Sequence, residues 1–187
     1  MKTALLVIDI QNDYFPGGKY ALVGPLAAAQ RAYILLQCFR ESGWPHVHIQ
    51  HIAQEPDATF FLPGERGTDI HDSAAHFEGE PIVYKHEPNA FLNTDLLTLL
   101  QGWGVERVVV AGMMTHMCVD ATARAAADLG FEVIVAADAC ATRDLVYDGT
   151  VVPADAVQKA FLAALTSYGQ VLPSDQVLAR LAAEKSP

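Results

Sequence analysis

Short segments rich in valine, leucine and isoleucine recur along the chain and are separated by longer segments with helical periodicity. The first of them, residues 4–8, is entirely apolar and ends at Asp9. Similar segments follow at 47–52, 81–85, 107–111, 131–137 and 170–172. Apolar strands without regular polar alternation are typical of a parallel sheet that is buried on both faces.

Between these strands, apolar residues recur at helical spacing over 25–42, 92–103, 115–129 and 154–166, and a last helix is expected from Ser174 onward. Asn93 or Thr94 is the expected N-cap of the second helix, and Ser174 that of the last. Strands alternating with helices predict an α/β fold in which helices cover both faces of a parallel sheet. Residues 53–80, rich in Gly, Pro and Asp, are expected to form a loop.

Length and charge narrow the class of protein. The 187 residues fit one domain, 1–187, and 51% of them are apolar, enough for a packed core. A net charge of −10 disfavours nucleic acid as a partner, because a phosphate backbone requires clustered Lys and Arg. Charges interrupt every apolar run before the roughly 18 residues of a membrane span. Three cysteines and the absence of a secretion signal favour a cytoplasmic location.

Ligands of parallel α/β sheets bind beyond the carboxyl ends of the strands, so residues just past the predicted strands are candidates: Asp9, Lys85, the segment 112–118 and Asp138. A carboxylate at the end of a buried strand is costly unless it has partners or a task. Asp9 could instead be a loop anchor or a phosphoacceptor, although the long loop after it disfavours phosphoacceptor chemistry. Lys85 either reaches solvent or extends toward Asp9 and stabilises its charge.

Cys118 lies where the sequence predicts a strand, a sharp turn and the first turn of a helix. The positive end of a helix dipole is expected to lower the pKa of its thiol, and free backbone N–H groups there can form an oxyanion hole. The alternative is a buried structural cysteine, which suits Cys38 and Cys140 better.

The histidines near the second strand give no metal-binding pattern. His46 and His48 are expected on one strand face and His51 on the other. None of them belongs to an Asp-x-His or His-Glu-x-x-His spacing. Nucleotide binding is also unsupported, because no Walker loop and no Gly-x-Gly-x-x-Gly motif follows the first strand.

Three separated segments together resemble the isochorismatase-like cysteine hydrolases. They are LVIDIQNDY at 6–14, Lys85 with NAFLNTDL at 89–96, and GMMTHMCVDATAR at 112–124. The resemblance continues through 129–131 and 138–142 and so covers nearly the whole chain. It implies a three-layer α/β/α fold with a six-stranded parallel sheet of Rossmann-type topology.

The resemblance further implies a Cys-Asp-Lys triad. Asp9 would take the proton from Cys118 and later activate water, while Lys85 keeps Asp9 ionised. Cys118 would attack a carbonyl group, release ammonia or an amine, and leave a thioester for water to cleave. The oxyanion would sit on the backbone N–H groups of Met114 and Cys118, and the family has a non-proline cis peptide where this chain has Met113–Met114.

By the same resemblance, Tyr14, Phe91 and His116 line the substrate pocket, and the protein forms a homodimer or a larger homo-oligomer. Nicotinamidases of this family bind a metal through an Asp-x-His pair after the second strand. Residues 49–52 (IQHI) lack that Asp, so we expect neither a metal nor another cofactor.

The expected substrate is a small molecule with an amide, carbamoyl or ureido-type C–N bond. Two alternatives remain open from the sequence. One is vinyl-ether hydrolysis of the isochorismatase type, which needs Asp9 and Lys85 but no thiol. The other is a non-catalytic family member that serves as a binding or assembly module.

Overall fold

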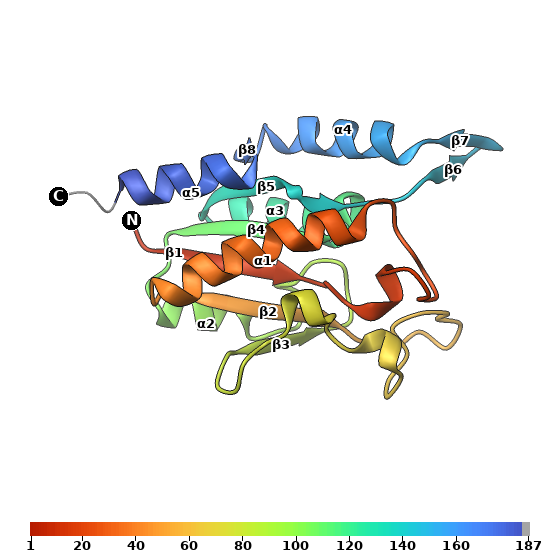
Figure 1. The fold of residues 1–187 in the computed structure, drawn as a ribbon, viewed down its shortest axis with the longest axis horizontal. Coiled ribbons are helices and arrows are strands. Elements are labelled where there is room, and N and C mark those ends of the chain that lie inside the picture. The colour runs from red at the N-terminus through yellow and green to blue at the C-terminus, as the bar shows by residue number, and fades with distance from the viewer. Residues whose placement is uncertain (185–187) are drawn as a thin grey trace.

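The computed structural model describes residues 1–184 and contains a six-stranded parallel sheet between layers of helices (Figure 1). The strand order is β3-β2-β1-β4-β5-β8. The strands are β1 (Thr3–Ile8), β2 (His46–His51), β3 (Ile82–Lys85), β4 (Arg107–Met113), β5 (Glu132–Ala141) and β8 (Gln170–Leu172). The predicted parallel α/β sheet is confirmed. Because β1 lies inside the sheet, its carboxyl end is flanked by strands on both sides.

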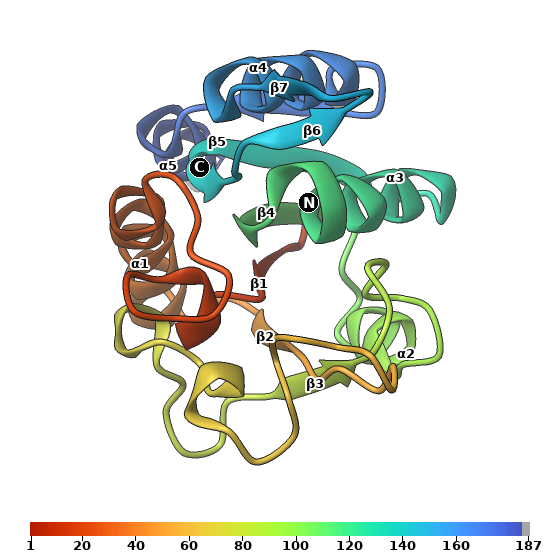
Figure 2. The same ribbon diagram turned by 90° about the vertical axis from the view of Figure 1, so that its right-hand side faces the viewer.

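Helices cover both faces of this sheet. Helices α1 (Pro25–Glu41) and α5 (Ser174–Ala183) lie on one face, and α2 (Leu96–Gly102) and α3 (Asp120–Asp128) lie on the other (Figure 2). Helix α4 (Ala154–Leu165) packs beside α3 and edge strand β8. None of the helices within residues 1–184 is both long and apolar enough to cross a membrane.

Strand β1 shows why its sequence has no polar alternation. Leu5 and Val7 belong to the apolar cluster under α1 and α5, whereas Ala4, Leu6 and Ile8 belong to the cluster under α2 and α3. Every residue of the strand is buried. An apolar residue is therefore needed at each of these positions, which accounts for the continuous run in the sequence.

Two predicted helix starts are wrong. The helix expected over 92–103 begins only at Leu96, because Asn93 adopts a left-handed φ of 55° and the hydroxyl of Thr94 donates to Ala90 O at 2.6 Å. Ser174 is not an N-cap but the first residue of α5. Its N–H and hydroxyl donate to the carboxylate of Asp138 at 2.7 and 2.9 Å. Asp138, a candidate site residue from the sequence, therefore binds the first residue of α5 through its carboxylate.

A β-hairpin that the sequence analysis missed projects from the sheet between β5 and α4 (Figure 1). It pairs β6 (Leu145–Tyr147) with β7 (Thr150–Val152) in antiparallel register. Asp148 and Gly149 connect the strands with φ values of 46° and 70°. Asp-Gly is a favoured pair for the tight turn of such a hairpin, so the signal was present in the sequence.

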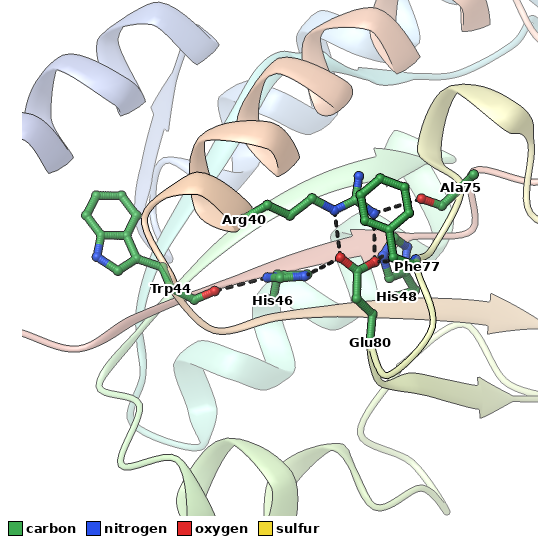
Figure 3. A network of polar contacts seen from close by, with 7 residues as sticks. All are labelled: Arg40, Trp44, His46, His48, Ala75, Phe77 and Glu80. Atoms are coloured by element: carbon green, nitrogen blue, oxygen red, sulfur yellow. Dashed lines mark hydrogen bonds and ion pairs between the residues drawn. The ribbon is translucent and has the colours of Figure 1, made fainter.

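At the amino ends of β2 and β3, the carboxylate of Glu80 joins α1 to the sheet (Figure 3). Arg40 donates to both of its oxygens at 2.6 Å, and Phe77 N–H donates at 2.8 Å. His46 and His48 contact the same carboxylate through Nε2 at 2.9 and 3.1 Å, so they share a strand face as predicted. Burial alone would raise the pKa of Glu80, but these hydrogen bonds outweigh it and hold that pKa well below its usual range.

His48 is neutral in this cluster. Only 1% of its surface is exposed, and its Nδ1 has no hydrogen-bond partner within residues 1–184. The proton therefore lies on Nε2, which donates to Glu80. Burial lowers the pKa of His48 from 6.5 to about 4, although contact with Glu80 acts in the opposite direction.

This burial predicts an acid-labile fold. Between pH 6.5 and about 4 the unfolded chain binds a proton that folded His48 does not, so stability falls as the pH drops through this window. The full effect is about 3 kcal/mol. His48→Gln keeps an N–H donor near Nε2 but cannot titrate, so its free energy of unfolding should depend less on pH. Urea unfolding of both proteins between pH 7 and 5 tests this, and parallel pH curves would contradict it.

Candidate active site

Asp9 sits at the carboxyl end of β1 in a strained backbone position. Its φ is 49°, in the left-handed region that Asp tolerates better than most residues, and its side chain is fully buried. Gly112 of β4 lies beside it in register with Ile8 and has a φ of 138°. A Cβ atom on Gly112 would lie 1.9 Å from the carbonyl oxygen of Ile8. Only glycine therefore lets the end of β4 lie this close to Asp9.

Lys85 ends β3 and reaches Asp9 across the intervening strand β2. Its Nζ lies 2.7 Å from Asp9 Oδ2, and both side chains have 0% exposure. An ammonium group buried without a counter-charge would be strongly unfavourable, so this ion pair is what keeps Lys85 inside the protein.

Cys118 approaches the same ion pair from the turn that follows β4. Lys85 Nζ donates to its Sγ at 3.3 Å. The predicted helix over 115–129 begins instead with a π-helical turn, Thr115–Val119, and becomes α-helical only as α3. The structure thus brings Asp9, Lys85 and Cys118 together from three separate elements.

A residue that the sequence analysis did not place here, His51, completes the cluster. It ends β2, and its Nδ1 lies 3.0 Å from Lys85 Nζ. The parallel register of β2 and β3 pairs His51 with Lys85, so both side chains leave the same face of the sheet. The sequence contained the histidine but not the register that pairs it with the lysine.

The pKa of the Cys118 thiol differs from the prediction. Burial raises its pKa, the charge of Asp9 raises it further, and Lys85 lowers it by less. The direction is opposite to the lowered pKa expected from a helix dipole, so that expectation was wrong. For Lys85, burial lowers the pKa, but Asp9 and Cys118 outweigh this and raise it, so the amine stays charged.

The carboxylate of Asp9 lies near this thiol. Cys118 Sγ is within 4.8 Å of a carboxylate oxygen of Asp9. Asp9 Oδ2 forms an ion pair with Lys85, and neither carboxylate oxygen accepts a well-formed hydrogen bond from the residues that the structure describes. A buried carboxylate oxygen in this position can accept a proton from the thiol.

An aromatic wall flanks the cluster. Tyr14 is buried, and its pKa is raised by burial and then by the proximity of the acidic groups of Cys118 and Asp9. The Phe61 ring packs edge-on against Tyr14, with 4.6 Å between centroids. The loop that carries Phe61 is held by the buried carboxylate of Asp13, which accepts the Phe61 N–H at 2.7 Å.

The other residues expected in the substrate pocket have packing roles in the structure. The Phe91 ring stacks on Phe131 with 6.1 Å between centroids. His116 lies in the π-helical turn, and its Nδ1 is 2.6 Å from the hydroxyl of Thr142. Their contact with a substrate stays a prediction, as does the oxyanion role of the Met114 and Cys118 N–H groups.

The peptide bond between Met113 and Met114 is cis, directly after β4. It lies at the position where the resemblance places such a bond.

Among residues 1–184, the one group of three side chains spaced to hold a metal ion is Asp9, His51 and Cys118. The ammonium of Lys85 contacts all three, at 2.7, 3.0 and 3.3 Å. A divalent cation at this position would have to displace a buried charge of the same sign. The cluster therefore does not fit a resident metal, because a fixed cation of the protein already fills it.

The fold and this cluster define a three-layer α/β protein with a buried cysteine beside an aspartate–lysine pair. A family model described as the isochorismatase domain matches residues 3–176. The chain belongs to the isochorismatase family of hydrolases, and the resemblance found in the sequence is confirmed.

Individual relatives agree with this assignment. The isochorismatase family protein YddQ of Bacillus subtilis is 53% identical over 179 residues, which cover 95% of this chain and 99% of that protein. A maleamate amidohydrolase of Pseudomonas putida is 32% identical over 148 residues, which cover 72% and 70% of the two chains. The crystal structure of an isochorismatase-family hydrolase from Oleispira antarctica superimposes with a TM-score of 0.91 at 49% identity, covering 95% and 96% of the chains.

The occupied cluster predicts a hydrolase that needs no metal. Exhaustive dialysis against EDTA and 1,10-phenanthroline should leave the hydrolytic rate unchanged, since the cation beside Asp9 is the side chain of Lys85. Elemental analysis of the dialysed protein, combined with the rate, checks this. A rate that falls on chelation and returns with zinc, iron or manganese would contradict it.

Proposed function

We propose that the protein hydrolyses an amide-type C–N bond of a small molecule, with Cys118 as nucleophile and Asp9 as base. The observation that carries the proposal is that one buried ammonium, Lys85 Nζ, lies 2.7 Å from Asp9 and 3.3 Å from Cys118. A thiol and its base that share a cation can exchange a proton without losing the counter-charge.

The first half of the reaction forms a thioester. Asp9 accepts the thiol proton, and the Cys118 sulfur attacks the carbonyl carbon of the substrate. The carbonyl oxygen becomes an oxyanion, which the N–H groups of Met114 and Cys118 stabilise. Asp9 then returns its proton to the leaving nitrogen, the C–N bond breaks, and ammonia or an amine departs.

The second half regenerates the enzyme. Asp9 is again a carboxylate and takes a proton from a water molecule, whose oxygen attacks the thioester carbon. Breaking the C–S bond returns the sulfur to Cys118, and the proton held by Asp9 moves back to it. Lys85 stays charged throughout and keeps Asp9 from being protonated by solvent.

The substrate class follows from the chemistry and the relatives together. Maleamate amidohydrolase cleaves a small amide, and carbamoyl and ureido compounds present the same carbonyl carbon bonded to nitrogen. The aromatic wall formed by Tyr14 and Phe61 suits a small planar group such as these. A screen of small amides, carbamoyl compounds and ureides that measures ammonia release will identify the substrate.

Removal of the nucleophile should stop this reaction. We expect Cys118→Ala to lower kcat by at least about a thousandfold, because no other group in the cluster can form the thioester. The matched control is Cys140→Ala, which removes another buried thiol, one that donates to Ala136 O. It should keep most of its activity. Ammonia release by both variants is the measurement, and more than a few per cent of kcat in Cys118→Ala would favour acid/base chemistry by Asp9 and Lys85 without a thiol nucleophile.

Asp9 and Lys85 should act as a unit. Asp9→Asn removes the base with little change in size, and Lys85→Ala raises the tendency of Asp9 to protonate, so each should abolish turnover. Lys85→Arg should not restore it, because a planar guanidinium does not fit a site shaped for a compact ammonium. The double variant should be scarcely slower than either single one. Kinetics of all four variants decide this, and multiplying losses would show that the two residues have separate tasks.

A further inference from the structure

We infer that His51 is a positioning residue of the active site, a neutral imidazole whose Nδ1 holds the Lys85 ammonium in place between Asp9 and Cys118. The catalytic meaning of this inference rests on the proposed function, whereas the contacts of His51 in the structure do not depend on it. Lys85 Nζ has three N–H bonds and three partners around it: an ion pair with Asp9 Oδ2 at 2.7 Å and hydrogen bonds to His51 Nδ1 at 3.0 Å and Cys118 Sγ at 3.3 Å.

The position of His51 is fixed by the backbone. The parallel register of β2 and β3 pairs it with Lys85. The buried side-chain amide of Gln11 then holds the backbone of His51 through both of its ends, donating to the carbonyl oxygen at 2.8 Å and accepting from the N–H at 2.8 Å. Gln11 also donates to Thr68 O at 2.7 Å, which ties the neighbouring loop to the same amide. A residue anchored in this way can orient a long, flexible lysine.

Counting protons assigns the tautomer of His51. An ammonium group only donates hydrogen bonds, so the nitrogen 3.0 Å from Lys85 must be an acceptor. The ring proton is therefore on Nε2, which has no hydrogen-bond partner in the described part of the chain. An imidazolium at this distance would place two positive charges in contact, so protonation of His51 must break its bond to Lys85.

The surroundings of His51 agree with a neutral ring. The titratable groups that face it come from the ends of β1, β2 and β3 and from the π-helical turn: Asp9, Glu55, Lys85, His86 and Cys118. Burial lowers the pKa of His51, the charge of Asp9 opposes this, and Lys85 lowers the pKa further. The net direction is downward, so the imidazole keeps its acceptor at neutral pH.

The role assigned to His51 is to hold the Lys85 ammonium where it contacts both Asp9 and Cys118. Without a third acceptor, Nζ is free to turn about the Lys85 side chain and to favour the charged Asp9 over the neutral thiol. Thiolate formation at Cys118 would then lose its counter-charge. The effect of His51 should therefore show in the reactivity of Cys118, not only in turnover.

The test uses the full-length protein and iodoacetamide, which alkylates the thiolate form of cysteine. Mass spectrometry of peptides follows Cys118, with Cys140 as internal reference. His51→Leu removes the acceptor, whereas His51→Asn has similar size and places an amide oxygen near the position of Nδ1. The matched control is His86→Leu, because His86 neighbours Lys85 in the chain but its Nδ1 contacts Ile52 O at 2.7 Å.

We expect His51→Leu to slow alkylation of Cys118 about tenfold at pH 7, the effect of one hydrogen bond to a charged group. His51→Asn and His86→Leu should stay within about twofold of the natural sequence. The thiolate fraction falls with pH in every variant, but the natural protein should lose additional reactivity as His51 protonates below pH 6.5, a loss that His51→Asn should not show. Long-range ¹H–¹⁵N spectra should show the Nε2–H tautomer of His51 at pH 7.

Several results would overturn the inference. In the alkylation experiment, they are an unchanged rate for His51→Leu, equal losses for His51→Leu and His51→Asn, or the same dependence of the rate on pH in the natural protein and His51→Asn. In the NMR experiment, they are an Nδ1–H tautomer or an imidazolium at pH 7. Circular dichroism and thermal unfolding establish that each variant is folded, and the NMR measurement needs no variant beyond that used for assignment. If the proposed function fails but these results hold, Cys118 is still a thiol whose reactivity His51 controls through Lys85.

Discussion

The contact between the buried ammonium of Lys85 and two acidic partners is the interaction on which this active site depends. In the proposed reaction the negative charge lies on Asp9 at the start and on Cys118 after proton transfer. Lys85 Nζ is 2.7 Å from one and 3.3 Å from the other, so the cation is paired in both states. In a buried site, moving the charge away from its counter-ion would be expensive. Under the proposed mechanism, the shared cation removes most of this cost, so that a thiol with a raised pKa can serve as nucleophile.

The sheet supplies this contact by bringing the ends of three strands to one edge. Parallel strands place their carboxyl ends together, and Lys85 is long enough to cross β2 and reach Asp9. The close approach of β4 to β1 requires glycine at Gly112, and the turn of the chain after β1 requires a left-handed residue at Asp9. These strained positions lie at the site itself, as is common where a fold must hold reacting groups in place.

Much of this arrangement follows from sequence because it depends on local patterns. The apolar runs predict the parallel sheet, and the motifs around Asp9, Lys85 and Cys118 identify the cluster. Properties set by packing could not be predicted in this way. The raised pKa of Cys118 comes from burial and from the neighbouring charge of Asp9, neither of which the sequence pattern reveals. The place of His51 depends on the register between β2 and β3, which no single strand encodes.

The two polar clusters of the sheet show what separates a structural carboxylate from a reactive one. Both combine a carboxylate, a basic side chain and histidine at an end of β2. Glu80 accepts hydrogen bonds at both oxygens, from Arg40, two histidines and a backbone N–H, so a further proton has nowhere favourable to bind. Asp9 forms one ion pair, through Oδ2 with Lys85, and neither of its oxygens accepts a well-formed hydrogen bond in the described chain. That incomplete set of donors, rather than the residue types, leaves Asp9 able to take the proton of Cys118.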